Sequence, residues 1–308
     1  MLAIVAPGQG AQTPGFLAPW LAEPSFADRI EWLSAVAGLD LRRYGTEADA
    51  DTIRDTAVAQ PLLVAAGLLA ALELLPGGRD DFASVGVVAG HSVGEITAAA
   101  CVGVLSAEQA MVLVRERGRE MAAASAATPT SMTAVVGGKP DEVLEAIERA
   151  GLTPANNNGS GQIVAAGTTD QLAALAADPP ARARLIALSV AGAFHTVHMR
   201  PAVERLDQLA RAIDTNDPTT RLLSNADGAV VGNGPEVLGR IVNQVANPVR
   251  WDLCMATMAD LGVTGLLELP PAGTLTGIAK RNLKNVELFS LNTPDQLADA
   301  REFVRAHP

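Results

Sequence analysis

The sequence predicts an α/β fold in two parts. A large domain around a parallel sheet is expected over residues 1–124 and 193–308, with a small α+β domain, residues 125–192, inserted into it. Three observations lead to this prediction. Short apolar runs alternate with helix-forming stretches, which favours a parallel sheet with helical crossovers. A serine between two glycines directly follows one of these runs. Within residues 125–192 the order becomes strand, helix, strand, strand, helix, strand, which is typical of ferredoxin-like domains.

Composition limits the classes of protein to which the chain can belong. Its 308 residues, 48% of them hydrophobic, suffice for a large core, and 19% charged residues argue against disorder. The net charge of −11 argues against a nucleic acid or an anionic membrane as partner. Cys101 and Cys254 are expected to be buried, reduced thiols. No basic residue precedes Arg29 and no apolar run suits a membrane span, so we expect a cytoplasmic protein.

The first strand is expected at Leu2–Ala6, where every residue is apolar. It leads into a glycine-rich loop, Pro7–Gln12. A nucleotide site is disfavoured there, because Thr13 breaks G-x-G-x-x-G and no G-K-[ST] follows. The loop is nevertheless a candidate site loop through its free N–H groups. A long apolar helix is then expected over Leu62–Leu75 and ends before Pro76-Gly77-Gly78.

The serine motif lies between a strand predicted at Val85–Ala89 and a helix predicted at Glu95–Val104. Gly90-His91-Ser92-Val93-Gly94 therefore has the context of a nucleophile elbow in an α/β-hydrolase-like domain. The turn exposes the hydroxyl, and the following helix N-terminus favours an oxyanion. The alternative is a structural turn, because such short glycine patterns also arise by chance. The flanking strand and helix favour the nucleophile.

Ser106 is expected to cap a helix that runs to about Ala124. The helix carries Arg115, Arg117 and Arg119. Residues 115 and 119 share one face and 117 lies on another. Periodicity alone predicts that all three side chains are solvated.

The remaining elements follow from the same patterns. In the inserted domain, strands are expected at 132–136, 152–155, 162–166 and 184–190, and helices at 141–150 and 169–177. Beyond it, strands are expected at 221–225 and 263–269, and helices at 235–245, at 257–261 and after Gly273.

The chain has four histidines, and His195 is the candidate catalytic base. It follows the predicted strand end of the inserted domain, where site residues gather in α/β folds. His91 adjoins the serine, His198 lies at the start of the next helix, and His307 is expected to fray with the terminal tail. A structural histidine is the alternative for His195. A serine with this histidine suits acyl transfer or hydrolysis. About a third of the chain follows His195, which does not fit the histidine position of an ordinary α/β-hydrolase.

The sequence contains the motifs Pro7-Gly-Gln-Gly-Ala-Gln12, Gly90-His-Ser-Val-Gly-Glu95, Arg117-Gly118, Gly192-Ala-Phe-His195, Gln244-Val-Ala-Asn-Pro248 and Leu275-Thr-Gly-Ile-Ala-Lys-Arg281. Through these motifs the chain resembles the malonyl-CoA:acyl carrier protein transacylases, the acyltransferase family of fatty-acid and polyketide synthesis, over essentially its whole length. One departure is Pro270-Pro271-Ala272-Gly273, where the family usually has Gly-Pro-Gly.

The resemblance implies a catalytic role for five residues. Ser92 is the expected nucleophile and His195 the expected base. The backbone carbonyl of Gln244 is expected to hold the second imidazole nitrogen in place of a carboxylate. The backbone N–H groups of Val93 and Gln9 are expected to form the oxyanion hole.

The resemblance also implies how substrate and partner are bound. Arg117 is expected to clamp the free malonyl carboxylate through paired hydrogen bonds. Phe194 is expected to press on the malonyl α-carbon and to disfavour methylmalonyl, with limited discrimination. Only three lysines exist, and Lys280 and Lys284 flank Arg281. These three residues are a candidate docking patch for an acidic carrier protein, although a solvated helix face is the simpler interpretation.

The implied reaction is a two-step transfer without a permanently bound cofactor or a metal. Malonyl-CoA acylates Ser92, and the phosphopantetheine thiol of a holo-acyl carrier protein then takes the malonyl group. Nothing in the sequence requires more than a monomer. The sequence leaves open a fatty-acid or a polyketide pathway, a serine thioesterase or esterase, and a non-catalytic carrier-docking module.

Overall fold

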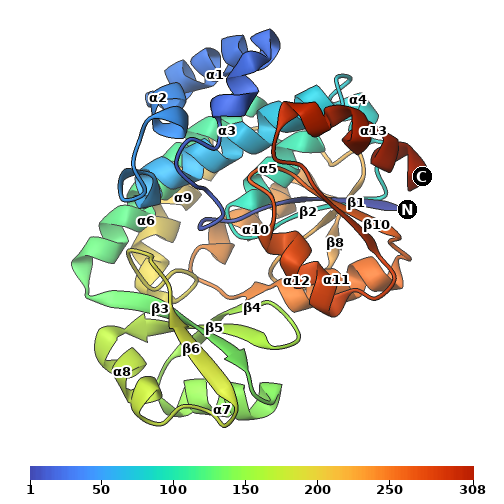
Figure 1. The fold of residues 1–308 in the computed structure, drawn as a ribbon. Coiled ribbons are helices and arrows are strands. Elements are labelled where there is room, and N and C mark those ends of the chain that lie inside the picture. The colour runs from blue at the N-terminus through green and yellow to red at the C-terminus, as the bar shows by residue number, and fades with distance from the viewer.

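The computed structural model describes residues 1–308 and contains two sheets, seen one above the other in Figure 1. The larger sheet has the order β11-β10-β1-β2-β7-β8. Its strands pair in parallel except for the edge pair β7 and β8, which is antiparallel. The α/β fold class is confirmed. The bounds are β1 Leu2–Ala6, β2 Val87–Gly90, β7 Arg221–Leu223, β8 Val230–Val231, β10 Gly265–Glu268 and β11 Glu287–Ser290.

The expectation of a wholly parallel large sheet is wrong at that edge. The chain between Leu223 and Val230 is too short for a crossover, so β8 returns antiparallel beside β7. The strand β11 and the C-terminal helix α13, Leu297–Ala306, were not anticipated, because their apolar patterns are short.

The expectation that His307 frays with the terminal tail is wrong. His307 is 7% exposed, and its Nδ1 lies 3.0 Å from the hydroxyl of Thr264.

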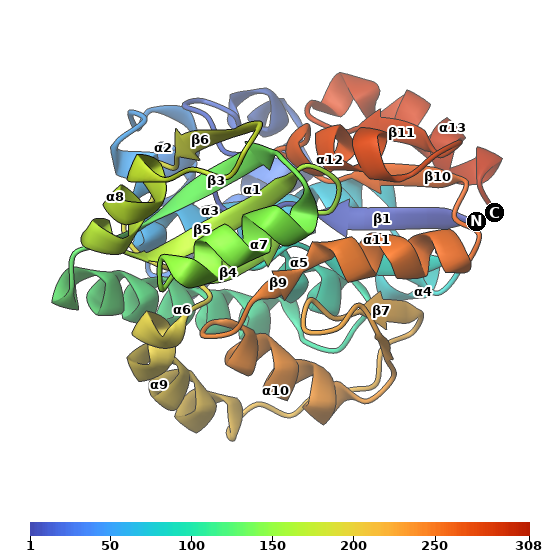
Figure 2. The same ribbon diagram turned by 90° about the horizontal axis from the view of Figure 1, so that it is seen from below.

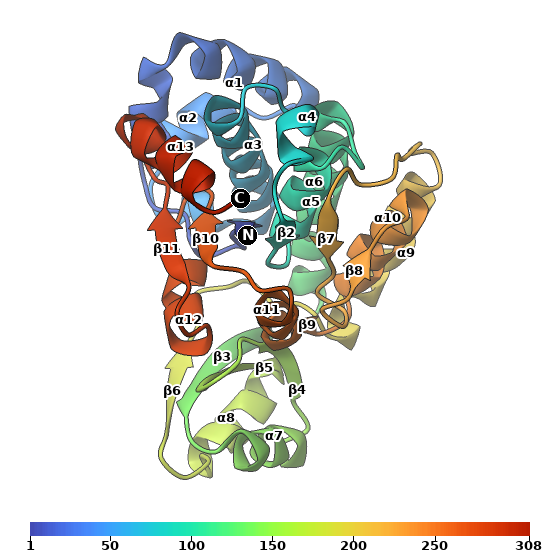
Figure 3. The ribbon, with the colours of Figure 1, turned by 90° about the vertical axis from the view of Figure 1, so that its right-hand side faces the viewer.

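Helices cover both faces of the larger sheet (Figure 3). Alternate residues of β1 face opposite cores: Ile4 belongs to the main cluster, whereas Val5 packs with α11 and α12. The main cluster includes residues of α1, α3, α5, α6, α9 and α10. The helix bounds are α1 Pro24–Ala37, α2 Leu41–Thr46, α3 Thr56–Leu74, α4 Arg79–Phe82, α5 Gly94–Cys101, α6 Ala107–Ala127, α9 Arg200–Ala210, α10 Gly234–Gln244, α11 Trp251–Asp260 and α12 Thr274–Asn282.

The helix α3 begins at Thr56, six residues before the predicted start at Leu62. The Asp55 carboxylate caps it by accepting the N–H of Ala57 at 2.8 Å. Pro61 lies inside this helix and removes one backbone hydrogen bond near its N-terminal end. α3 is long and apolar enough to cross a membrane, but 83% of its apolar window is buried inside the protein. We therefore assign it to the core.

The smaller sheet has the order β6-β3-β5-β4-β9 (Figure 2). Two helices pack on it and enclose a separate hydrophobic cluster. The two-residue strand β9, Val249–Arg250, comes from the later part of the chain and pairs in parallel with β4. The sequence pattern predicted only the end of a helix there. The bounds are β3 Thr130–Gly137, α7 Pro140–Arg149, β4 Thr153–Asn157, β5 Gln162–Thr168, α8 Thr169–Ala177 and β6 Ala183–Ala187.

Candidate active site

Ser92 occupies a sharp turn between β2 and α5, with φ at 55°. A non-glycine residue is rarely found in this region of backbone space, so the turn is strained. The two flanking glycines are required by contact. A Cβ on Gly90 would lie 1.9 Å from the carbonyl carbon of Gly94, and a Cβ on Gly94 would lie 2.3 Å from the oxygen of Ala6. The motif therefore forms the predicted strand–turn–helix geometry.

His195 lies directly against the serine. Its Nε2 is 2.8 Å from Ser92 Oγ, and its Nδ1 is 2.9 Å from the carbonyl oxygen of Gln244 at the end of α10. A carbonyl oxygen only accepts hydrogen bonds, so Nδ1 carries the proton and Nε2 can accept the serine hydroxyl proton. β6 ends at Ala187, so His195 lies in the loop beyond this strand and not directly at its end.

The imidazole of His195 is uncharged at neutral pH. Its pKa is lowered from 6.5 to about 3, chiefly by burial and also by the positive charge of Arg117, against the opposing effect of the Gln244 carbonyl. A neutral imidazole with a free Nε2 lone pair has the state that a general base requires.

Arg117 lies in α6 and is 2% exposed. One guanidinium nitrogen donates to the amide oxygen of Gln60 at 2.7 Å, and another donates to Ser92 Oγ at 3.3 Å. Burial lowers the pKa of Arg117 to about 10, which leaves it charged at neutral pH. The periodicity prediction of a solvated side chain is wrong here. Arg115 and Arg119 are more exposed, with 31% and 65% of their side chains accessible.

Two backbone N–H groups beside the serine make no hydrogen bond within the protein: those of Val93 and Gln9. Val93 precedes the first residue of α5, where N–H groups have no partner inside the helix. Gln9 lies in the loop after β1 and lines the same cleft as Ser92. These donors are available to an oxygen that carries developing negative charge.

A serine, a neutral histidine and a buried arginine thus share one site at the end of β2. The model of the family described as "Acyl transferase domain" matches residues 4–301 of the chain. The chain belongs to the acyl transferase family.

Named relatives agree with this membership. The malonyl CoA-acyl carrier protein transacylase of Mycobacterium tuberculosis H37Rv is 51% identical over 306 residues, covering 97% of this chain and 100% of that protein. The protein of the same name from Escherichia coli K12 is 32% identical over 308 residues, covering 97% and 98%.

Solved structures show the same fold. The crystal structure of the Mycobacterium tuberculosis enzyme superposes with a TM-score of 0.94 at 51% identity and covers 98% of this chain and 99% of that one. A malonyl-transacylase solved in complex with a type II polyketide synthase acyl-carrier protein has a TM-score of 0.89 at 29% identity, with the same coverage.

The active-site cleft of this acyl transferase has a volume of about 230 Å³ and is lined by strands of the smaller sheet and by the loops that follow β1 and β2. Phe194 lines it beside His195 and is 6% exposed. A larger cavity, of about 590 Å³, lies among the ends of α3, α5 and α6, but contains no nucleophile and base in contact. We therefore place the chemistry in the smaller cleft. Its remaining apolar lining comprises Met121, Met132, Ala134, Val164, Leu188, Val190, Leu275 and Ile278.

The helix α12 connects the cleft with the candidate docking residues. Leu275 and Ile278 line the cleft, whereas Lys280, Arg281 and Lys284 are exposed at and beyond the C-terminal end of the helix.

The loop Pro270-Pro271-Ala272-Gly273 before α12, which departs from the family pattern, is held by the buried Glu268. Its carboxylate accepts the N–H groups of Gly273, Leu275 and Thr276 at 2.8 to 2.9 Å. The chain has no cluster of three or more metal-ligating side chains.

Sequence reasoning missed two residues of the site. Asn225 is fully buried, and its amide accepts the N–H of Ser92 at 2.7 Å and donates to the carbonyl of Gly90 at 2.8 Å. Its place at the end of a predicted strand was a usable signal. Gln60, which binds Arg117, precedes Pro61 in an apolar helix, and no local pattern marks it.

Proposed function

We propose that this chain transfers the malonyl group of malonyl-CoA to the phosphopantetheine thiol of an acyl carrier protein through an ester on Ser92. The observation that carries the proposal is the buried Arg117 guanidinium, 3.3 Å from the nucleophile that His195 contacts at 2.8 Å. A fixed positive charge beside the nucleophile favours an acyl group that ends in a carboxylate. The named relatives support the same substrate class.

The first half-reaction forms the acyl-enzyme. Ser92 Oγ attacks the thioester carbonyl while His195 Nε2 takes the hydroxyl proton. The negative charge on the carbonyl oxygen is received by the N–H groups of Val93 and Gln9. The C–S bond then breaks, and the CoA sulfur leaves with the proton from His195. In the second half-reaction the carrier thiol gives its proton to His195, attacks the ester, and Ser92 recovers its proton.

Arg117 is proposed to select the substrate. In the structure its guanidinium binds Gln60 and Ser92 Oγ. A malonyl carboxylate would replace the weaker contact with Ser92 and form paired charge-assisted hydrogen bonds. This exchange would also free the serine hydroxyl for attack. Lysine cannot reproduce the planar paired contact.

Phe194 is proposed to limit the size of the acyl group. Its ring is buried in the cleft beside the base. A ring there leaves little room for a second α-substituent, which disfavours methylmalonyl. A contact of this kind discriminates by about 10- to 200-fold, so the selection is incomplete.

Lys280, Arg281 and Lys284 are proposed to dock the carrier protein. They are exposed, and they follow the helix whose other residues line the cleft. A chain of net charge −11 needs a local basic surface to bind an acidic partner. The complex of a related transacylase with its acyl-carrier protein supports a protein partner of this type.

The finer architecture also belongs to this proposal. We assign residues 1–124 and 193–308 to an α/β-hydrolase-like catalytic domain, and residues 125–192 to an inserted ferredoxin-like domain. The β-α-β-β-α-β order of β3 to β6 and the separate cluster beneath that sheet support the division. We further propose a cytoplasmic monomer without a permanently bound cofactor.

The test is the intact mass of the protein after brief mixing with malonyl-CoA, beside Ser92→Ala. We expect a gain of one malonyl group that is absent in the variant and is discharged by a holo-acyl carrier protein. CoA release without a mass gain would indicate hydrolysis, the thioesterase alternative. The absence of both a mass gain and CoA release would contradict the malonyl assignment. Comparing fatty-acid and polyketide carrier proteins in the discharge step would separate the two pathways.

A further inference from the structure

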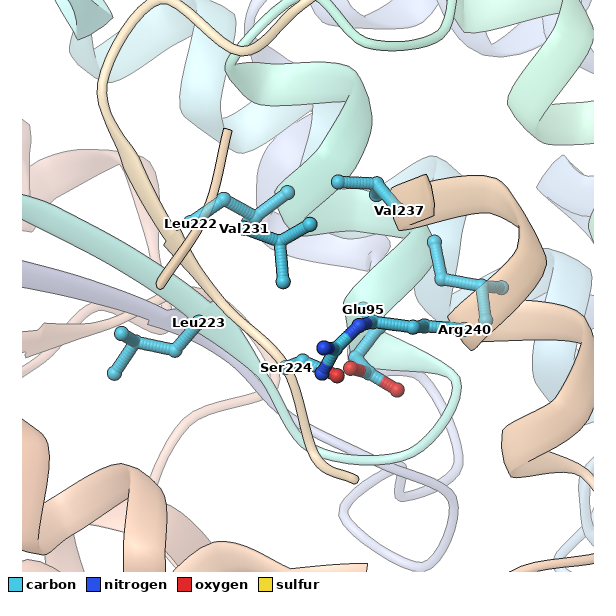
Figure 4. A pocket seen from close by; sticks show the side chains of 8 residues that line it. Glu95, Leu222, Leu223, Ser224, Val231, Val237 and Arg240 are labelled. Atoms are coloured by element: carbon cyan, nitrogen blue, oxygen red, sulfur yellow. The ribbon is translucent and has the colours of Figure 1, made fainter. Parts of the chain in front are cut away.

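Glu95 is a buried acidic residue that the proposed reaction does not use. It lies in the first turn of α5, three residues after the nucleophile, and is 5% exposed. Its carboxyl group borders a void of about 10 Å³, separate from the active-site cleft and shown in Figure 4. The void is bounded mainly by Leu222, Leu223, Val231, Val237 and Ile241, with Ser224 and Arg240.

A chain of hydrogen bonds leads from Glu95 to the nucleophile. Glu95 Oε1 accepts the backbone N–H of Asn225 at 2.8 Å. The side chain of Asn225 in turn holds both sides of the serine turn, through the N–H of Ser92 and the carbonyl of Gly90. A strained residue such as Ser92 keeps its conformation only where the surroundings determine it. Glu95 therefore holds Asn225, the residue that fixes the conformation of Ser92.

The carboxyl group has no cationic partner. Arg240 extends from α10 toward Glu95 in Figure 4, but its guanidinium forms ion pairs with Asp227 and Glu236 and none with Glu95. Glu95 Oε2 has no hydrogen-bond partner in the protein. The surrounding side chains are mostly apolar, and an unpaired carboxylate is costly in such a place. The void has about the volume that one water molecule needs.

The neighbouring charges do not make the Glu95 carboxyl group ionise at neutral pH. Burial raises the pKa of Glu95 from 4.5 to about 8. The N–H of Asn225 and the charges of Arg117 and Arg240 act in the opposite direction, and Asp227 acts with burial. Cys254, which contacts the Asn225 amide, is itself kept protonated because burial raises its thiol pKa.

We propose that Glu95 is a positioning residue that works as an uncharged carboxylic acid. One oxygen anchors Asn225, and thereby the Ser92 turn, while the Oε2 hydroxyl donates to a single water in this void. The activity part of this inference rests on the proposed function; the stability part does not.

The stability test compares Glu95→Gln with the unaltered protein between about pH 5 and pH 8 by thermal unfolding. Because the folded pKa is raised, an unfolded Glu95 releases its proton from about pH 4.5, and the folded one only near pH 8. The stability of the unaltered protein therefore falls across this range relative to the glutamine variant. We expect the Tm of the variant, relative to the unaltered protein, to rise with pH. A relative Tm that falls with pH, or stays constant, would overturn the proposal.

The exposed Glu236→Gln is the matched control, because Glu236 also belongs to the Arg240 cluster. It should show no such rise. A rise of equal size in this control would assign the effect to Arg240 and would overturn the proposal.

The activity test follows the rate of malonyl-enzyme formation. Glu95→Gln keeps the acceptor oxygen and should stay within about twofold of the unaltered rate. Glu95→Ala leaves the Asn225 N–H unpaired and should slow acylation by about tenfold or more, with the KM for malonyl-CoA unchanged. Full activity of Glu95→Ala would contradict positioning. If Glu95→Ala does not fold, a tenfold loss in Glu95→Gln would contradict it instead. If the unaltered protein forms no malonyl ester, the proposed function fails, while the unfolding comparison still decides the state of Glu95.

Discussion

Burial gives single residues of this site their chemical character. His195 has the same side chain as the exposed histidines of other proteins, but burial and the charge of Arg117 keep it neutral. Arg117 stays charged because the fall in its pKa, to about 10, ends well above neutral pH. The result is a neutral imidazole and a permanent cation that both contact one hydroxyl. These are the states required for transfer of an acidic acyl group.

Arg117→Lys should lower kcat/KM for malonyl-CoA by about 100-fold, because charge-assisted hydrogen bonds contribute roughly 1.5–3 kcal/mol each. The loss for acetyl-CoA should be smaller, because acetyl has no carboxylate to bind. The measurement is acyl-enzyme formation from both thioesters. Arg119→Lys, on the same helix with its side chain 65% exposed, should change neither value. Equal losses for both thioesters would contradict a carboxylate clamp.

The titration of His195 is a second prediction at this scale. We expect the imidazole to titrate near pH 3, and Arg117→Gln to raise its pKa, because that change removes a nearby positive charge. NMR titration of the ring protons measures both values, and His195→Gln identifies the signal. A midpoint near 6.5 in the unaltered protein would contradict the burial argument. Since the folded pKa is depressed, this residue stabilises the fold above about pH 6.5, and the contribution is lost as the pH falls toward 3.

The position of a helix is set by its capping residues and by how closely it packs on its neighbours, and α6 shows both. Ser106 Oγ accepts the N–H of Gln109 at 3.1 Å, and the Gln109 side chain accepts the N–H of Ser106 at 2.8 Å. This reciprocal cap confirms the predicted start of α6. Farther along α6, a Cβ on Gly118 would lie 2.8 Å from the oxygen of Thr56. The glycine therefore lets α6 pack closely on α3, and it brings Arg117 to Gln60.

Gly94→Ala should lower the free energy of unfolding by about 1–3 kcal/mol, because its Cβ would lie 2.3 Å from the oxygen of Ala6. Gly239→Ala in α10 is the matched control. It has no atom within 4 Å of an added Cβ and should raise stability by about 0.5–1 kcal/mol. Urea denaturation measures both. If Gly94→Ala leaves the free energy of unfolding unchanged, α5 can move away from β1 without cost.

For the whole molecule, the strands of the smaller sheet and the loops after β1 and β2 of the larger sheet meet at one cleft. Ser92 comes from the larger sheet, His195 from the chain that returns from the smaller sheet, and Arg117 from the helix that leads into it. β9 ties the later chain to β4, and the N- and C-termini lie beside each other at the far end (Figures 1 and 2). The cleft that α12 borders is the route that we propose for substrate and carrier to Ser92.

Reversal of charge at the docking patch tests this approach. Lys280→Glu with Lys284→Glu should raise the KM for the holo-acyl carrier protein by about tenfold at low salt, and less at high salt. Formation of the malonyl-enzyme from malonyl-CoA should not change. The exposed Arg211→Glu, at the end of α9, is the control. An unchanged KM would place the carrier elsewhere.

The sequence alone predicted features that depend on neighbours within a few residues. These are the alternation of strands and helices, the serine turn, the cap of α6 and, through the family motifs, Ser92, His195 and Arg117. Each of these features depends on local backbone geometry or on a motif of a few residues, so it can be predicted without knowledge of the fold.

Only the tertiary structure decided the contacts between distant segments. Asn225 is 133 positions from Ser92, and Gln60 is 57 positions from Arg117. Helical periodicity predicted that Arg117 is solvated, because periodicity shows which residues share a face of the helix but not which segment packs against that face. The same is true of β9 and of the neutral Glu95, whose environment is made by β7, β8 and α10. Burial, and with it pKa and hydrogen bonding, depends on which segments meet, and this is decided by the packing of the whole chain.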